Sequence, residues 1–125
     1  MLNKKQFFFT LFLFYMALLC FLLFSGDLGF NYTRYPYQDK LLHFGAFSLG
    51  QLLVFLTGKF KSFINYFCYS VFLMLPALTE IIQAQLPTRV KDFSDMLAGY
   101  MGILTCIVLW YLIKIIYKYF FLKER

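Results

Sequence analysis

The sequence has little charge and very little proline or histidine. Only 14% of its 125 residues are charged, and it contains three prolines and one histidine. Soluble domains carry about 25% charged and about 45–50% apolar residues, whereas here 62% of the residues are hydrophobic and 23% are aromatic. These shortages exclude an ordinary soluble domain. The length excludes a multi-domain protein, because 125 residues provide for one domain of roughly four membrane spans.

Cysteine is equally scarce. Cys20, Cys68 and Cys106 are the only three, and each lies inside an apolar run. We interpret them as small hydrophobic packing residues and not as disulfide partners or metal ligands. Familiar catalytic signatures such as H-E-x-x-H and G-x-S-x-G are absent as well. The sequence therefore identifies no cofactor.

Long hydrophobic runs are the feature that the chain does have. Four of them predict transmembrane helices at about residues 7–24, 41–57, 63–86 and 93–119. The connections between them are short, so consecutive helices should be antiparallel. We therefore expect an all-α membrane protein whose residues 1–125 form a single domain of four transmembrane helices.

The charges that are present divide between the two sides of this topology. The side that holds both termini and the loop between the second and third helices carries eight basic residues and one acidic residue. The other side carries four basic and five acidic residues. Since cytoplasmic loops are enriched in Lys and Arg, both termini should be cytoplasmic. The net charge of +6 thus indicates orientation, and nucleic acid is not an expected partner.

Polar residues accumulate at the extracytoplasmic ends of three of these helices. Helical spacing places Asp39 and His43 on one face of the second helix, while Glu80 lies late in the third and Asp95 early in the fourth. Ionisable groups at membrane depth cost about 2.5–3.5 kcal/mol each, so they require mutual pairing or a wet cavity. The candidate catalytic residues are His43, Glu80 and Asp95, and the candidate substrate-binding residues are Asp39, Lys40, Gln83, Arg89 and Asp92.

Structural roles for the same residues stay open. Asp39 and Asp95 would serve as helix N-caps, and Arg89 would serve only to neutralise nearby carboxylates. A lone His43 would be a packing residue. Asp92 and Asp95 are weak candidates for divalent-metal ligands, but no diagnostic ligand spacing accompanies them, so the sequence predicts no metal site.

Three motifs follow one another in this region: D-K-L-L-H-F from Asp39, E-I-I-Q from Glu80, and R-V-K-D-F-S-D from Arg89, followed by Gly102. Together they resemble the VanZ-like family of small polytopic bacterial membrane proteins, over about half of the chain. The resemblance implies a multi-pass protein of the bacterial cytoplasmic membrane, with a cell-envelope role linked to glycopeptide-antibiotic resistance. The chain differs from the family pattern at Gly99, where Asn is usual.

Three functions are compatible with these residues. The first is a membrane enzyme that binds or modifies a lipid or lipid-linked cell-wall precursor, with His43 as acid/base, Glu80 as a second carboxylate and Arg89 as an anion clamp. The second is a non-catalytic binding, shielding or assembly partner of envelope enzymes. The third, and least favoured, is a small proton-coupled transporter. The expected partners are the lipid bilayer and such a precursor, and the sequence does not indicate an oligomeric state.

Overall fold

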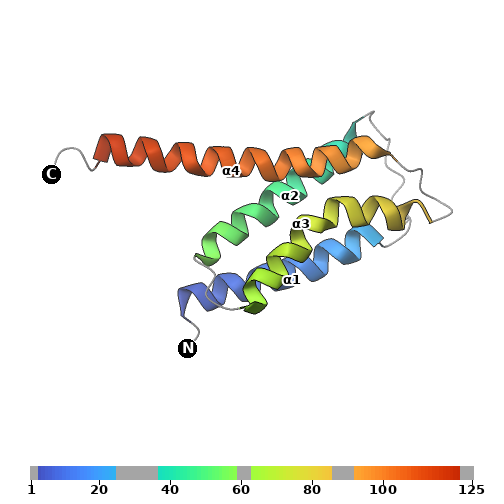
Figure 1. Cartoon of the computed structure of the whole chain (residues 1–125), viewed down its shortest axis with the longest axis horizontal. Helices are drawn as coiled ribbons and strands as arrows, with labels where there is room; N and C mark the ends of the chain where they lie inside the picture. Colours follow the sequence, from blue (N-terminus) through green and yellow to red (C-terminus); the bar gives the residue numbers. More distant parts are fainter. Residues whose placement is uncertain (1–2, 25–36, 59–62, 86–91, 122–125) are drawn as a thin grey trace.

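The computed structural model describes residues 3–24, 37–58, 63–85 and 92–121, and these residues form four helices. Figure 1 shows them in chain order: α1 (Lys4–Phe24), α2 (Gln38–Thr57), α3 (Phe63–Gln83) and α4 (Phe93–Phe121). Each helix contains a stretch that is long and apolar enough to cross a membrane. The predicted all-helical architecture is therefore confirmed, with four candidate spans at the four hydrophobic runs.

Side-chain caps explain where α1 and α4 begin. The Asn3 side-chain Oδ1 accepts a hydrogen bond from the Gln6 N–H at 2.9 Å, and the Asn3 N–H donates to Gln6 Oε1 at 2.9 Å. This reciprocal pair satisfies backbone donors that the first turn leaves unpaired. At α4, Asp92 Oδ1 accepts from the Ser94 N–H at 2.9 Å, which makes Asp92 the N-cap.

Residues with a positive φ flank α2. Tyr37, with φ of 87°, precedes the helix without a side-chain cap, and its carbonyl accepts the Leu41 N–H at 3.0 Å. Gly58, with φ of 81°, ends the helix, as glycine commonly does because it lacks a Cβ. Asp39 lies inside the first turn, so its interpretation as the N-cap is wrong. Its negative charge still favours the helix by opposing the N-terminal dipole.

α2 and α4 lie side by side and run in the same direction. They form the most extensive helix pair of the fold, while α1 packs on α2 and α3, and α3 also packs on α4. The direction follows from three contacts spaced along the pair. These contacts join Lys40 to Asp95, Ser48 to Gly102, and Phe55 to Trp110.

Glycines allow the helices to approach closely, because they place no side chain at the contact. A Cβ on Gly102 would overlap the backbone carbonyl oxygen of Phe44. At the same point the Ser48 hydroxyl donates to the Gly102 carbonyl at 2.9 Å. On the other side of α2, a Cβ on Gly50 would lie 2.5 Å from Cε2 of Phe72.

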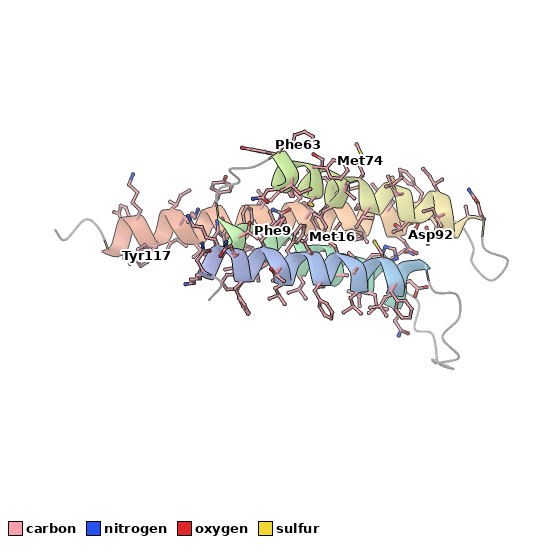
Figure 2. All side chains as sticks on the ribbon, turned by 90° about the horizontal axis from the view of Figure 1, so that it is seen from below. Phe9, Met16, Phe63, Met74, Asp92 and Tyr117 are labelled. Atoms are coloured by element: carbon pink, nitrogen blue, oxygen red, sulfur yellow. The ribbon has the colours of Figure 1, made fainter. Side chains whose placement is uncertain are left out.

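Three fully buried phenylalanines form the centre of the bundle. Phe72 of α3 contacts Phe12 of α1 and Phe47 of α2, with ring centroids 5.8 Å and 5.9 Å apart. Most other large apolar side chains project outward, as Figure 2 shows for Phe63 and Met74, which are 84% and 60% exposed. Such an apolar exterior is compatible with contact to a lipid bilayer and does not suit water.

Aromatic and basic side chains gather on α4 far from its start. The Trp110 ring stacks on Phe55 of α2 with centroids 5.0 Å apart. The Lys114 ammonium lies over the rings of Trp110 and Tyr111, at 5.2 Å and 5.9 Å from their centroids. This combination is typical of a membrane–water interface, where aromatic rings and basic residues anchor a helix.

Candidate functional site

Three ionisable side chains from three helices meet at the end of the bundle where α2 and α4 begin. His43 comes from the second turn of α2, Glu80 from the last turn of α3, and Asp95 from the first turn of α4. One nitrogen or oxygen atom from each lies within 4.8 Å of those from the other two. Each residue is within about two helical turns of the nearer helix end, so the site lies close to one end of the spans. We call His43, Glu80 and Asp95 the polar cluster.

The polar cluster is largely shielded from solvent. His43 and Glu80 are only 6% and 4% exposed, and the side chain of Asp95 is 14% exposed. The His43 ring also neighbours the Phe47 ring, with centroids 6.3 Å apart, so the core continues directly beneath it. Burial penalises the charged form of such groups, so their charges must be balanced locally.

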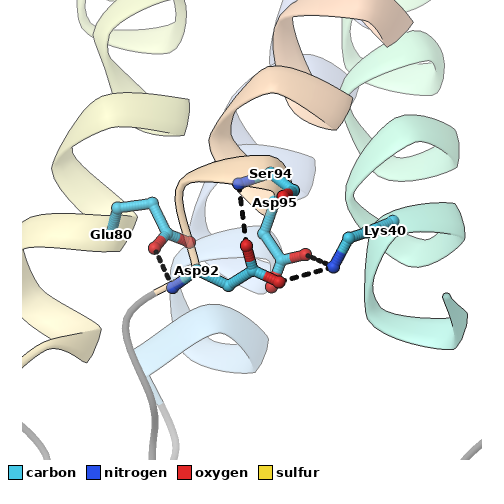
Figure 3. Close-up of polar contacts among 5 residues, drawn as sticks. All are labelled: Lys40, Glu80, Asp92, Ser94 and Asp95. Carbon is cyan, nitrogen blue, oxygen red and sulfur yellow. Dashed lines mark hydrogen bonds and ion pairs between the residues drawn. The ribbon is translucent and has the colours of Figure 1, made fainter. Parts of the chain in front are cut away.

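The start of α4 holds the Glu80 carboxylate in place. The backbone N–H of Asp92 donates to Glu80 Oε2 at 3.2 Å, as Figure 3 shows. Because Asp92 also caps α4, the same residue fixes both the beginning of that helix and the position of the glutamate.

The helix that carries Glu80 is bent. Figure 1 shows α3 changing direction between its green and yellow parts. Pro76 lies within this helix, and a proline bends a helix by removing one backbone hydrogen bond.

Lys40 pairs with both aspartates of α4. Its Nζ lies 2.5 Å from Asp92 Oδ2 and 3.2 Å from Asp95 Oδ1 (Figure 3). The hydrogen bond from Lys40, followed by that from the Ser94 backbone, lowers the pKa of Asp92 to about 2. Asp92 is therefore ionised at neutral pH, and one ammonium is shared between two carboxylates.

The structure brings five of the eight predicted site residues together. They are Lys40, His43, Glu80, Asp92 and Asp95. The N-cap interpretation of Asp95 is wrong, because Asp92 is the cap and the Asp95 N–H donates to the Asp92 carbonyl at 2.9 Å.

The three other predicted site residues are less defined. Asp39 lies in the first turn of α2 next to Lys40. Gln83 is in the last turn of α3, but its side chain is not among those described. Arg89 lies outside the described residues. Their predicted roles in substrate binding stay predictions.

Gln51 is a buried polar residue that was not among the predicted site residues. Its side chain is fully buried, its Oε1 accepts the Tyr69 hydroxyl at 3.3 Å, and its Nε2 has no hydrogen-bond partner among the described residues. Gln51 lies four residues after Phe47 and eight after His43, so the three share one helix face. That spacing is the sequence signal that points it inward.

Comparisons of the chain with protein-family models, with curated proteins and with solved structures find no match. The chemistry of the site is therefore inferred from its geometry. An imidazole beside two carboxylates can exchange protons with a bound substrate. Within the described part of the chain, His43, Glu80 and Asp95 are also the residues whose donor atoms are close enough to bind one metal ion.

Proposed function

We propose that this chain is a multi-pass protein of the bacterial cytoplasmic membrane that binds and modifies a lipid or lipid-linked envelope substrate at the polar cluster. One observation carries the proposal: three ionisable side chains from three helices converge at one end of an otherwise apolar bundle, two of them almost fully buried. Such residues are costly in a membrane, and they commonly mark functional sites.

The proposed topology puts this site on the extracytoplasmic side. Consecutive helices would alternate in direction, since the end of α3 at Glu80 meets the start of α4 at Asp92. The parallel pair α2 and α4 fits the same alternation. The basic residues at the opposite ends, including Lys114 and Lys118, favour cytoplasmic termini.

The depth of the polar cluster suits a substrate with a polar headgroup and an apolar tail. The cluster lies within about two turns of the helix ends, near the level where lipid headgroups meet the hydrocarbon core. A headgroup would reach His43 and Glu80 while its acyl or polyprenyl chain stayed against the outward apolar surface. In a transfer or hydrolysis step, one of these two groups would take the proton of the attacking hydroxyl or water and the other would protonate the leaving oxygen.

The resemblance to VanZ-like proteins supports an envelope role. Its motifs contain every member of the polar cluster together with Lys40 and Asp92, and these residues lie together in the structure. Membership of the family is part of the proposal, as is the link to glycopeptide antibiotics.

The test compares bacteria that express the wild-type protein with bacteria that express His43→Ala, Glu80→Gln or Thr79→Val. Thr79 is the matched control, because it is buried beside Glu80 and its hydroxyl donates to the Pro76 carbonyl of its own helix. Mass spectrometry of extracted lipids and lipid-linked precursors, with glycopeptide susceptibility alongside, is the measurement. Relative to cells without the protein, we expect wild type and Thr79→Val to change the lipid profile and the glycopeptide susceptibility in the same way. His43→Ala and Glu80→Gln should not change either. The proposal would be contradicted by lipid profiles that are unchanged in every strain, or by folded His43→Ala and Glu80→Gln variants that still produce the wild-type effect.

Binding without catalysis is the second candidate, and the Lys40 ion pairs favour it. An ammonium already shared by Asp92 and Asp95 resembles a satisfied structural network. In that case native mass spectrometry of the purified protein should show a retained lipid, Glu80→Gln should reduce its retention, and no modified lipid should accumulate in cells.

A further inference from the structure

We propose that His43, Glu80 and Asp95 together bind one divalent transition-metal ion of the Zn²⁺ or Mn²⁺ type. The inference deepens the proposed function, since it rests on the same site. With the ion bound, His43 and Glu80 would serve as its ligands, and the ion would activate the substrate or water as a Lewis acid in place of their direct proton transfer. The inference starts from the relative positions of the three side chains, which come from three different helices.

The separation of the donor atoms suits a single ion. Nitrogen and oxygen ligands bind Zn²⁺ at about 2.0–2.2 Å, so two ligands of one ion lie at most roughly 4.4 Å apart. The donor atoms of the polar cluster all lie within 4.8 Å of one another. Side-chain rotations that shorten the longest of these separations by a few tenths of an ångström would bring all three donors to one ion.

The charge around the polar cluster favours a divalent cation. Among the described residues, the carboxylates of Glu80, Asp92 and Asp95 face the single ammonium of Lys40. Carboxylate oxygens are ligands that divalent cations bind readily. Glu80 and the Asp95 side chain are 4% and 14% exposed, so water would screen the attraction between these two carboxylates and a bound cation only weakly.

The kinds of donor indicate which metal is preferred. Mg²⁺ and Ca²⁺ prefer sites made of oxygen alone, whereas imidazole is a common ligand of first-row transition metals. Three protein ligands also leave coordination positions open, as in catalytic zinc sites. A phosphate or carboxylate oxygen of a headgroup, or a water molecule, would occupy such a position, where the ion would polarise it.

Two contacts around the polar cluster resemble the outer partners of metal ligands. The Asp92 N–H orients the Glu80 carboxylate at 3.2 Å, and Lys40 holds Asp95 at 3.2 Å. Hydrogen bonds of this kind fix the orientation of ligating groups, and their loss typically weakens metal affinity about 10–100-fold.

The single histidine of the chain makes a direct test available. Protein purified in detergent without a histidine tag is stripped with EDTA and titrated with MnCl₂, and bound Mn²⁺ is counted by electron paramagnetic resonance. We expect about one ion per chain, with electron spin echo modulation from one imidazole nitrogen. Selective ¹⁵N labelling of histidine should change that modulation, which assigns the ligand to His43 in the wild-type protein without any mutation.

Variants then test the two carboxylates. Glu80→Gln and Asp95→Asn should each weaken Mn²⁺ binding by at least about 10-fold, while Thr79→Val should bind as wild type does. ZnCl₂ should displace Mn²⁺, and MgCl₂ and CaCl₂ should do so only at much higher concentration. Circular dichroism establishes that each variant is helical.

Three results would overturn the inference: no stoichiometric Mn²⁺ or Zn²⁺ in folded wild type, bound Mn²⁺ without nitrogen modulation, or unchanged binding in both carboxylate variants. Mn²⁺ binding by the Arg89→Ala variant but not by the wild-type protein would also overturn the inference. That result would mean that the Arg89 guanidinium, and not a metal ion, neutralises the polar cluster. Metal binding is measured without substrate, so it can fail or succeed independently of the lipid profiles that test the proposed function.

Discussion

The Lys40 ammonium lies 2.5 Å from Asp92 Oδ2 and thereby joins the first turn of α2 to the residue that caps α4. The two residues are 52 positions apart in the chain. Asp92 in turn donates its backbone N–H to Glu80 of α3. One short segment at the start of α4 therefore connects three helices at the level of the polar cluster.

Replacing Lys40 with methionine should weaken this connection. Lys40→Met leaves Asp92 and Asp95 without their shared cation, so the two carboxylates repel each other. We expect a modest decrease in the melting temperature of the detergent-solubilised protein, since the Lys40 and Asp92 side chains are 31% and 42% exposed and solvent screens the pair. The decrease should shrink at high salt.

A double-mutant cycle checks the origin of that effect. Asp92→Asn keeps an N-cap but removes the charge. If the ion pair is responsible, Lys40→Met and Asp92→Asn should together cost less than the sum of their separate effects. Strict additivity would show that Lys40 stabilises the fold by other contacts.

Gly102 should not tolerate a side chain. A Cβ at this position would overlap the Phe44 carbonyl oxygen, and backbone yields less readily than a flexible side chain. Gly102→Ala should therefore push α2 and α4 apart and destabilise the protein by about 1–3 kcal/mol, in the range of overpacking substitutions. Thermal unfolding in detergent measures this.

Gly45 is the matched control for Gly102. It lies in α2, and a Cβ there meets nothing within 4 Å. Gly45→Ala should leave the melting temperature unchanged or raise it, because alanine is favoured over glycine in helices by roughly 1 kcal/mol. Equal destabilisation by both substitutions would contradict the close-contact explanation.

Gly99 should resist the asparagine that is usual in VanZ-like proteins. A Cβ at Gly99 would lie 2.8 Å from Phe47 Cδ2 and 3.2 Å from Pro76 Cβ. In this chain the Phe47 ring thus occupies the space that an asparagine would need. We expect Gly99→Asn to lower the melting temperature and Phe47→Leu to relieve part of that loss in the double variant. Additive losses would mean that the Phe47 ring is not the obstacle.

The proposed topology predicts opposite labelling at the two ends of the bundle. In a variant with Cys20, Cys68 and Cys106 replaced by alanine, single cysteines replace Tyr37 or Lys118, which are both exposed. A membrane-impermeant maleimide added to intact cells should label the residue-37 cysteine only. Broken cells should label both. Labelling of the residue-118 cysteine alone in intact cells would show that the orientation is the reverse of the proposed one.

The sequence predicted the helices well because apolar runs are a local signal. The exceptions are at helix ends: α1 and α2 begin three residues before the predicted starts, at Lys4 and Gln38, and α3 ends three residues before the predicted end, at Gln83. The Asn3–Gln6 cap that begins α1 lies outside the apolar run. Convergence of His43, Glu80 and Asp95 was also predictable, because alternating helix directions bring the start of the second helix, the end of the third and the start of the fourth to one end of the bundle.

Other features depend on which helices become neighbours, and the hydrophobic pattern of each helix does not reveal its neighbours. Lys40 pairs with Asp92 and Asp95 because α2 and α4 pack side by side. Gln51 gains a partner only because α3 brings Tyr69 against it. The sequence placed the start of α4 correctly at residue 93, and that start makes Asp92, and not Asp95, the residue in the cap position.

The aromatic anchor on α4 sets the depth of the polar cluster. Asp95 and Trp110 belong to one continuous helix and are fifteen residues apart, which corresponds to about 22 Å along its axis. If Trp110 and Lys114 are held at one surface of the bilayer, membrane thickness decides whether Asp95 meets the headgroups or lies in hydrocarbon at the other. A thicker membrane would submerge the polar cluster and a thinner one would lift it into water, so the acyl-chain length of the surrounding lipids becomes a variable of the site itself.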